Sequence, residues 1–299
     1  MKVIVTIPAY NEEKTLGPVL KDIKSVMDKE SQKERFDYQM LVIDDGSGDK
    51  TAEVAKQTGA SVVQHQRNRG LAETFRTEMT NCLKLGADVI VHTDADGQYR
   101  ASEIPGLLKK IKEGYDFVLA SRFMGQIEEM PWLKRFGNRA FSRVISNITG
   151  LSISDGQTGF RAFTKEVAEK ITITSNHTYT QEQIIRAARL KFRMIEIPAY
   201  FAKRGGNTKS RLMKNPFDYA MKAGLNLLRV YRDYEPLRFF GRIGALFLGA
   251  GIVLGGYLIY LYITNGAIGR VPSLMLSVLL MSIGLQIILF GFLADIFRK

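Results

Sequence analysis

Two carboxylates follow a short apolar run in the stretch DVIVHTDADGQ, residues 88–98. The run at 88–92 is rich in β-branched side chains and predicts a buried strand. Aspartates one residue apart at a strand end can direct both side chains to one cation. Mg²⁺ and Mn²⁺ are hard ions, which proteins commonly hold with one or two carboxylates and substrate phosphates. An ordinary Asp-Gly turn explains the same letters, so the surrounding sequence has to decide between the two interpretations.

The first part of the chain alternates between β-rich and amphipathic runs. Strands are expected at 2–7, 40–43, 61–64, 88–92 and 117–120, and helices at 16–27, 51–58, 72–85 and 104–112. Apolar strands separated by helices are typical of a mostly parallel sheet covered on both faces. We therefore expect an α/β fold, in which ligands bind at the carboxyl ends of the strands.

Polar segments follow four of these expected strands, at 8–13, 44–49, 93–98 and 121–122. Any one of them can be turn chemistry, but four at one edge of a parallel sheet predict a binding site. The segment DDGSGD at 44–49 suits a nucleobase edge or ribose hydroxyls, and a helix cap at Ser47 or Asp49 is the alternative. Tyr10 offers a ring for stacking on a base, unless it is only a partly buried surface tyrosine.

The C-terminal part of the chain contains two uncharged apolar segments, at 243–264 and 273–294. Each has roughly the 20 residues that a helix needs to cross the hydrocarbon core of a bilayer. A buried core helix is the alternative for each, but two in series favour a transmembrane hairpin. Positive charges flank the hairpin at Arg232, Arg238, Arg242, Arg298 and Lys299. The positive-inside rule then predicts a multi-pass protein of the cell membrane with its catalytic domain and both termini in the cytoplasm.

The formal net charge of +12 has two common explanations, nucleic acid and anionic lipid. The arginines gather near the membrane segments, which favours lipid phosphate and gives no reason to expect nucleic acid. The single cysteine, Cys82, cannot form an intramolecular disulfide and suits a reducing compartment. The N-terminal residues 1–10 predict a strand that leads into a motif, not a signal peptide.

Two further segments have helical spacing. At 131–148 the apolar positions include Leu133, Phe136 and Phe141, with four basic residues on other faces. This pattern predicts either a helix packed on the sheet with a solvated basic side, or a helix close to a bilayer whose arginines contact phosphates. The segment 215–234 mixes apolar and basic residues and leads into the first apolar segment, which favours an interfacial position.

The motifs resemble those of family 2 glycosyltransferases with the GT-A fold, in the order TIPAYNEE at 6–13, VIDDGSGDKT at 42–51, NRGL at 68–71, DADGQ at 94–98 and SRF at 121–123. The likeness covers roughly the first 165 residues. Within that family the chain is similar to dolichyl-phosphate mannose synthases and related polyprenyl-phosphate glycosyltransferases, through DGQTGFR at 155–161, GGNTK at 205–209 and EPLRF at 235–239. Processive polysaccharide synthases need a Q-x-x-R-W element, which this chain does not contain: its only tryptophan is Trp132.

The resemblance implies a Rossmann-like GT-A catalytic domain and a set of site residues. Those implied to contact the nucleotide-sugar donor are Pro8, Tyr10, Glu12, Asp44, Asp94, Ala95, Gln98, Arg204 and Lys209. A Mg²⁺ or Mn²⁺ ion is implied at Asp94, Asp96 and Gln98, and an acceptor phosphate at Arg122, Lys134, Arg135 and Arg139. Direct catalytic roles are expected for Asp96, Arg122 and Asp155.

The resemblance implies a metal-dependent, inverting transfer of a hexose of the mannose or glucose type. The donor is a GDP- or UDP-linked sugar and the acceptor is dolichyl or polyprenyl phosphate, so that the product is a lipid-linked monosaccharide for glycan assembly. A phosphate monoester has a second pKa of about 6 and is already anionic near neutral pH, so it needs alignment by basic residues but no general base.

Two alternatives remain open. One is transfer to a hydroxyl of a lipid-linked glycan or glycolipid, for which Asp155 or Glu182 would serve as the base. The other is a membrane-tethered nucleotide-binding scaffold without turnover. The expected domains are a catalytic domain at 1–212, an amphipathic interfacial helix and linker at 213–238, and the hairpin at 239–299. The bilayer is an expected partner, and an oligomer is possible.

Overall fold

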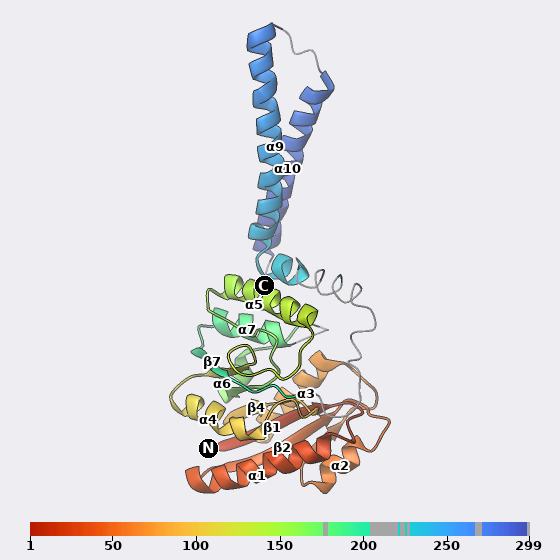
Figure 1. Ribbon diagram of the computed structural model, residues 1–299, viewed down its shortest axis with the longest axis vertical. Coiled ribbons are helices and arrows are strands. Elements are labelled where there is room, and N and C mark those ends of the chain that lie inside the picture. Colours follow the sequence, from red (N-terminus) through yellow and green to blue (C-terminus); the bar gives the residue numbers. More distant parts are fainter. Residues whose placement is uncertain (176–178, 204–220, 222–224, 226–227, 267–270, 298–299) are drawn as a thin grey trace. The chain divides into compact units, whose positions relative to one another are not determined.

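The computed structural model describes residues 1–175, 179–203, 221, 225, 228–266 and 271–297. The chain divides into two compact units, Met1–Tyr219 and Ala220–Lys299. The first unit is a sheet with helices on both sides, and the second is a pair of long helices (Figure 1).

One sheet organises the first unit, and the described residues give it seven strands in the order β3-β2-β1-β4-β6-β5-β7. The strands are β1 (Lys2–Ala9), β2 (Asp37–Asp44), β3 (Ser61–Gln64), β4 (Val89–His92), β5 (Phe117–Ser121), β6 (Arg161–Thr164) and β7 (Met194–Pro198). Only β6 runs antiparallel to its neighbours. Six strands therefore end at the same edge of the sheet, and β6 begins there.

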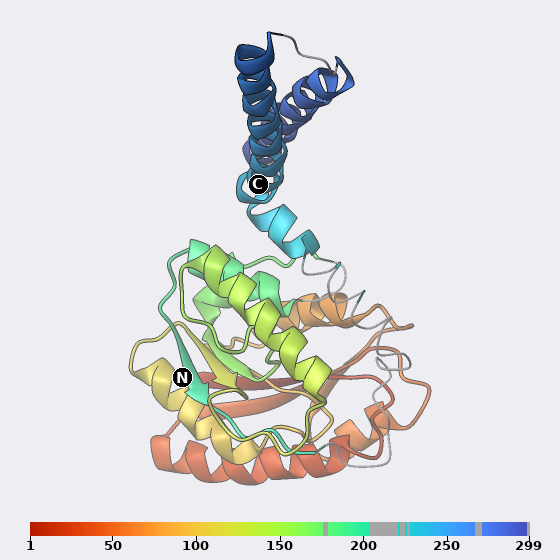
Figure 2. The ribbon, with the colours of Figure 1, turned by 45° about the horizontal axis from the view of Figure 1, so that its top comes forward.

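Helices cover both faces of the sheet. Their bounds are α1 (Leu16–Glu34), α2 (Thr51–Gln57), α3 (Leu71–Lys84), η1 (Ala101–Glu103), α4 (Ile104–Lys112), α5 (Trp132–Thr149), α6 (Lys165–Lys170) and α7 (Thr180–Arg189). In Figure 2, α1 and α4 lie on one side, whereas α3, α6 and α7 lie on the other, with α5 beside α7. Val3, Ile4 and Val5 are fully buried in succession because both faces of β1 are covered.

The α/β class and the mostly parallel sheet are confirmed. All five expected strands and all four expected helices occur, and the largest difference is α1, which continues to Glu34 instead of ending near residue 27. Strands β6 and β7 were not expected from the sequence. They are short, and β6 reverses the parallel pattern on which the expectation rested.

Helix α5 confirms the helix expected at 131–148, but its buried face differs from the expected one. Asn138, Phe141, Ser142 and Ile145 are buried, whereas Phe136 is 69% exposed. The expectation that Phe136 belongs to a packed apolar face is wrong. Polar Ser142 fits on that face because its hydroxyl donates to the Asn138 backbone carbonyl at 2.9 Å and accepts the Gly156 N–H at 3.0 Å. The side-chain nitrogen of Asn138 is buried without a hydrogen-bond partner among the described residues.

The second unit consists of α9 (Pro236–Asn265) and α10 (Val271–Ile296), both long and apolar enough to cross a membrane. With a rise of 1.5 Å per residue they are about 45 and 39 Å long, against a hydrocarbon core of about 30 Å. Only 11% and 17% of their most apolar windows are buried, whereas a core helix of a soluble protein is mostly buried. The expected segments at 243–264 and 273–294 lie inside these two helices, which form a candidate membrane hairpin.

Small residues let the two helices approach closely. A Cβ at Gly244 would lie 2.6 Å from the Gly284 carbonyl oxygen, and one at Gly251 would lie 2.9 Å from that of Ser277. The Ser277 hydroxyl donates to the Gly251 carbonyl at 2.8 Å. Close packing and an interhelical hydrogen bond of this kind are the forces that associate helices in lipid.

Candidate active site

The loops that follow β1 and β2 brace each other at the sheet edge. Asn11 adopts a left-handed φ of 54°, accepts the Gly48 N–H at 2.9 Å and donates its own N–H to the Ser47 hydroxyl at 2.9 Å. The Glu12 N–H donates to the Thr51 hydroxyl, also at 2.9 Å. This bracing brings together four residues expected to contact the donor: Pro8, Tyr10, Glu12 and Asp44.

Asp44 is the buried acid of this corner, with no solvent exposure. Its Oδ1 accepts the Ser47 N–H at 3.0 Å and the Ser47 hydroxyl. Its Oδ2 has no hydrogen-bond partner among the described residues. A buried acceptor without a donor is costly, so this oxygen is a place where the N–H or O–H of a ligand can bind.

The carboxylate of the next residue, Asp45, is already hydrogen-bonded by other parts of the protein. Its carboxylate accepts the N–H groups of Arg69 and Gly70, each at 2.9 Å, and lies 2.7 Å from Nδ1 of His65. These contacts anchor the segment before α3, where Gly70 has a φ of 88°. Asp45 is therefore a structural residue.

The D-x-D turn leaves β4 at the same edge, next to β1. The Asp96 carboxylate accepts the Gln98 N–H at 3.1 Å, and Ala95 between the acids is buried. In the described part of the chain no group donates a hydrogen bond to the Asp94 side chain. Burial, together with the negative charge of Asp96, raises the pKa of Asp94 to about 6. The absence of a donor to Asp94 among the described residues, with the second acid Asp96 beside it, favours a bound cation.

This donor set fits a hard divalent ion. Asp94 and Asp96 supply oxygen ligands, and no cluster of three or more acidic, histidine or cysteine side chains suited to a metal occurs within the described residues. Two carboxylates leave coordination positions for water and for substrate phosphate, which is how Mg²⁺ and Mn²⁺ are usually bound. A soft-metal or structural zinc site would need thiolates or imidazoles at this turn.

The loop before β6 forms a wall against Asp94. A Cβ on Gly159 would lie 2.8 Å from both carboxylate oxygens of Asp94, so any larger residue there would displace that carboxylate. The Gly159 carbonyl lies 2.7 Å from Nδ1 of His92, and its N–H donates to the Tyr99 hydroxyl at 3.3 Å. His92 in turn lies 3.2 Å from the buried Glu78 carboxylate. Burial lowers the pKa of His92, but Glu78 outweighs that effect and holds it above its ordinary value.

Arg122 follows β5 and forms a buried ion pair with Asp155. Its Nε and Nη2 donate to the two carboxylate oxygens at 2.6 and 2.8 Å, and its backbone N–H donates to the same group at 3.1 Å. Arg122 is 5% exposed and Asp155 is fully buried. The positive charge of Arg122 also reaches Asp94, where it opposes the rise in pKa. Asp155 therefore positions Arg122 near the D-x-D turn, and its expected catalytic role stays a prediction.

Neither of the carboxylates considered as a general base is available in this arrangement. Asp155 is occupied by Arg122, and Glu182 accepts the N–H groups of Thr174 and Ser175 at 2.9 and 2.8 Å and Nε of Arg186 at 2.8 Å. Burial raises the pKa of Glu182, but these donors hold it below its usual value. Glu182 organises the start of α7 and does not face a substrate as a free base.

Gln98 connects the D-x-D turn to the segment that follows β7. Its side-chain N–H donates to the Ala202 carbonyl at 3.1 Å, and its backbone carbonyl accepts the Ala202 N–H at 2.8 Å. The Phe201 ring lies 5.4 Å from Tyr99 and 5.1 Å from the Arg122 guanidinium. Gln98 thus joins the D-x-D turn to the segment at Ala202, and Phe201 in that segment contacts Tyr99 and Arg122. Arg204 and Lys209, expected to contact the donor, lie outside the described residues, as does most of the segment 215–234.

The basic residues expected at the acceptor phosphate lie on α5. The Arg139 guanidinium is 5.5 Å from the ring of Phe123, which directly follows Arg122. Lys134 and Arg135 lie one turn earlier on the same helix. The structure thus places Arg139 beside the end of β5, whereas Lys134 and Arg135 lie further toward the start of α5.

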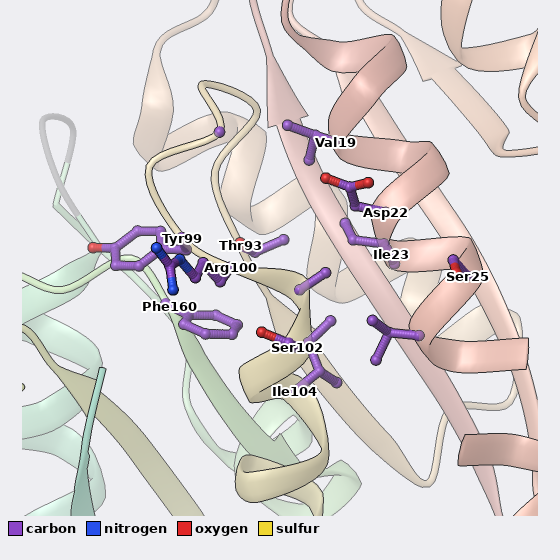
Figure 3. A pocket seen from close by; sticks show the side chains of 13 residues that line it. Val19, Asp22, Ile23, Ser25, Thr93, Tyr99, Arg100, Ser102, Ile104 and Phe160 are labelled. Atoms are coloured by element: carbon purple, nitrogen blue, oxygen red, sulfur yellow. The ribbon is translucent and has the colours of Figure 1, made fainter. Parts of the chain in front are cut away.

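A cavity of about 300 Å³ lies behind the D-x-D turn, between α1 and the segment that leads into α4 (Figure 3). Asp22 and Ser25 of α1 and Tyr99 and Phe160 on the opposite side contribute to its lining. Thr93 and Gly97 also line it, whereas Asp94 and Asp96 do not. The cavity is therefore separate from the two metal-binding candidates.

Sequence analysis did not assign His92, Tyr99, Glu78 or Gly159 to the site. Gly159 lies inside the DGQTGFR segment, which was quoted only for its resemblance. One signal was available in the sequence: His92 lies in the apolar strand that leads to the D-x-D turn. A polar side chain buried in a strand needs hydrogen-bond partners, which indicates further polar groups beside it. Those partners come from α3 and from the loop before β6, whose position depends on the antiparallel strand that was not expected.

The sheet and the position of the D-x-D turn at its edge are those of a glycosyltransferase of the GT-A type. The family model for glycosyl transferase family 2 matches residues 4–172, more than half of the chain, and the chain belongs to that family. It is a glycosyltransferase, as the resemblance implied.

Among curated relatives, the chain is 33% identical over 226 residues to a dolichyl-phosphate hexose transferase of Haloferax volcanii, covering 76% of this chain and 92% of that one. It is 28% identical to an undecaprenyl-phosphate 4-deoxy-4-formamido-L-arabinose transferase of an Enterobacter strain, with 98% and 87% covered. A crystal structure of glucosyl-3-phosphoglycerate synthase from Mycobacterium tuberculosis with Mn²⁺, UDP and glucosyl-3-phosphoglycerate has a TM-score of 0.57 at 16% identity, covering 76% and 79%. That likeness supports the fold.

Proposed function

We propose that this chain transfers a hexose from a GDP- or UDP-linked donor to dolichyl or another polyprenyl phosphate, with inversion at the anomeric carbon. Relatives whose names specify dolichyl and undecaprenyl phosphate as acceptors support the acceptor class. A divalent metal, Mg²⁺ or Mn²⁺, supports the reaction, in line with the Mn²⁺ and UDP of the structural neighbour.

The observation that carries this proposal is the contrast between the two sides of the site. Asp94 and Asp96 form an acidic side, and on the other side the exposed Arg139 adds positive charge close to Arg122, whose own charge is balanced by Asp155. The two carboxylates considered as bases are occupied by cations and N–H groups. An acceptor that is already anionic suits such a site, because it needs a positive group to hold it in line and no proton acceptor.

Each part of the site then has a role. Asp44 and Tyr10 bind the base and ribose of the donor, and Pro8, Glu12, Ala95 and Gln98 complete that corner. The metal held by Asp94 and Asp96 neutralises negative charge on the departing diphosphate. Arg122, aligned by Asp155, holds the acceptor phosphate with Lys134, Arg135 and Arg139. Arg204 and Lys209 are proposed for the diphosphate.

The membrane hairpin keeps the enzyme at the bilayer that contains its acceptor. We extend the proposal to topology: the catalytic unit and both termini lie on the cytoplasmic side, and the positive flanks Arg232, Arg238 and Arg242 support this orientation. The proposed division is a catalytic domain at 1–212, an interfacial segment at 213–238 and the hairpin at 239–299.

The test is transfer of radiolabelled sugar by the full chain reconstituted in lipid. Each of a panel of GDP- and UDP-linked hexoses is supplied with polyprenyl phosphate, with the corresponding polyprenol, or with a lipid-linked glycan. We expect label in solvent-extractable phospholipid only with the phosphate acceptor, and loss of that label in excess chelator.

Two other outcomes would replace the proposal. Label that appears with a hydroxyl acceptor and not with polyprenyl phosphate would favour the hydroxyl-acceptor reaction. Tight binding of nucleotide sugar with no transfer to any acceptor would favour the scaffold.

A further inference from the structure

Arg161, the first residue of β6, is fully buried and contacts only neutral groups. Its Nη1 donates to the side-chain oxygen of Gln183 at 2.9 Å and to the Thr180 carbonyl at 3.3 Å, and its Nη2 donates to the Thr158 carbonyl. Its Nε has no hydrogen-bond partner among the described residues. Because a guanidinium stays protonated in proteins, this interior position holds a full positive charge.

Two other buried basic side chains near the D-x-D turn each have a carboxylate. Arg122 is paired with Asp155 at 2.6 Å, and His92 lies 3.2 Å from Glu78. In the described part of the chain no carboxylate forms an ion pair with Arg161. Burying a charge without a partner is costly, so the compensation of Arg161 has to come from a carboxylate that is further away.

Asp94 is the carboxylate that remains for this role. Arg161 lies directly opposite His92 in the antiparallel pairing of β6 with β4, and Asp94 follows His92 by two residues. The Arg161 side chain reaches back to the Thr158 carbonyl, and the next residue, Gly159, lies against both carboxylate oxygens of Asp94. Burial lowers the pKa of Arg161, and the negative charge of Asp94 is among the effects that oppose this. The two charges thus compensate each other in part, without a hydrogen bond between them.

We propose that Arg161 is a positioning residue of the metal site: its charge acts on Asp94 and keeps the affinity for a bare divalent cation low until the nucleoside diphosphate is present. A cation at Asp94 would take over the carboxylate that compensates Arg161, and the guanidinium would repel it. The diphosphate brings negative charge that relieves this repulsion, because phosphate oxygens complete the coordination of such ions. The metal and the nucleotide therefore enter and leave the site together.

This inference rests on the proposed metal site at Asp94 and Asp96, but not on which sugar or acceptor the enzyme uses. The alternative is that Arg161 is only a structural residue, which holds the loop before β6 through its hydrogen bond to Thr158. The two interpretations differ in whether the charge or the hydrogen bonds of Arg161 matter for metal binding.

Three variants separate the charge of Arg161 from its hydrogen bonds. Arg161→Met removes both, whereas Arg161→Lys keeps the charge but loses the planar fork that reaches Thr158, Thr180 and Gln183. Gln183→Glu keeps the shape of the accepting side chain and gives the guanidinium the carboxylate that it lacks. Because this third variant leaves Arg161 in place, it tests the charge even where Arg161→Met fails to fold.

The measurement is calorimetric titration of the full chain with Mn²⁺, with and without saturating UDP or GDP, at about pH 8 so that Asp94 is ionised. We expect Arg161→Met and Gln183→Glu to lower the Kd for Mn²⁺ without nucleotide by about tenfold or more, since charges inside a protein interact strongly. The change should be smaller with nucleotide bound, and Arg161→Lys should behave as the wild-type chain does in both titrations.

The matched control is Lys165→Gln, which removes one positive charge directly after the other end of β6. Lys165 is exposed, so solvent and salt screen its charge and the Kd for Mn²⁺ should not change. Weaker Mn²⁺ binding in both Arg161→Met and Arg161→Lys would show that Arg161 acts only through its hydrogen bonds, and would overturn the proposal. An unchanged Kd in Gln183→Glu would overturn it as well.

Failure of the metal site itself has a different signature. If the wild-type chain bound no Mn²⁺ with or without nucleotide, the metal site and this inference would both be wrong. If Mn²⁺ bound to the wild-type chain and not to Asp96→Ala, the metal site would stand, and the Arg161 and Gln183 variants would decide the inference by themselves.

Discussion

Two pairs of acids lie at the same edge of the sheet: Asp44 and Asp45 follow β2, and Asp94 and Asp96 follow β4. The two pairs differ in the hydrogen bonds that the rest of the protein makes to them. Asp45 accepts two backbone N–H groups and lies against His65. In Asp44, Oδ1 accepts hydrogen bonds from Ser47, whereas Oδ2 has no hydrogen-bond partner among the described residues. Asp94, after β4, receives no hydrogen bond from the described residues, and its pKa is raised by burial and by Asp96. A carboxylate that the protein itself saturates supports the fold, whereas one left uncompensated is held ready for a ligand.

The largest expected effect is on the two acids of the D-x-D turn. Asp96→Ala removes a metal ligand and should lower sugar transfer by about 10³-fold or more, with little change in the denaturant midpoint. Excess chelator should reproduce the loss in the wild-type chain, and Mg²⁺ or Mn²⁺ should reverse it. Transfer that persists in Asp96→Ala, or in excess chelator, would exclude the metal from this reaction.

Asp45→Ala is the converse experiment. It leaves the N–H groups of Arg69 and Gly70 and the His65 ring without their acceptor, and should lower the free energy of unfolding by about 3 kcal/mol or more. Denaturant unfolding of the catalytic unit within the full chain measures this effect, with Asp96→Ala as the matched control. Equal destabilisation by the two variants would remove the distinction between the pairs.

The sequence predicted that both pairs of acids lie at the edge of the sheet, but not that Asp45 is hydrogen-bonded by the protein whereas Asp94 is not. Apolar strands and amphipathic helices predicted the α/β sheet, and acids after strands predicted its active edge, because both depend on local pattern. The saturation of Asp45 depends on His65 and Arg69, which the chain brings back after β3. The wall beside Asp94 depends on β6, which runs against its neighbours and places Gly159 at the active edge. Long-range contacts of this kind leave no periodic signal.

Gly159→Ala should produce an intermediate effect, through Asp94. The new Cβ would lie 2.8 Å from both Asp94 oxygens, and the carboxylate would have to move. We expect the metal-dependent part of nucleoside diphosphate affinity to fall by about tenfold to a hundredfold, since displacements near 1 Å have effects of this order. Calorimetric titration with and without Mn²⁺ separates that part from binding of the base.

Gly137→Ala is the control for this substitution, because its Cβ meets nothing within 4 Å on α5. It should leave both titrations unchanged. If Gly159→Ala weakened binding equally with and without Mn²⁺, Gly159 would support the donor site in general and not Asp94 in particular.

The smallest expected effect is a pH dependence of metal binding. The pKa of Asp94 is raised to about 6 in the folded protein from an ordinary value of 3.8, because burial and Asp96 disfavour its ionised form. A raised carboxyl pKa means that the metal-free protein loses stability as the pH rises from the lower value through the higher one. A divalent cation offsets that loss, and it competes with the proton below pH 6.

We therefore expect the apparent Kd for Mn²⁺ to rise by about tenfold for each pH unit below 6 and to level off above it, as displacement of one proton requires. The increase in melting temperature on adding Mn²⁺ should be larger at about pH 7.5 than at about pH 5. Asp45→Asn supplies the comparison. Asp45 lies outside the metal site, so its replacement should leave the pH dependence of the apparent Kd for Mn²⁺ unchanged. A Mn²⁺ affinity that is flat between these pH values would show that Asp94 is ionised throughout, and that the two acid pairs differ in their contacts but not in their protonation.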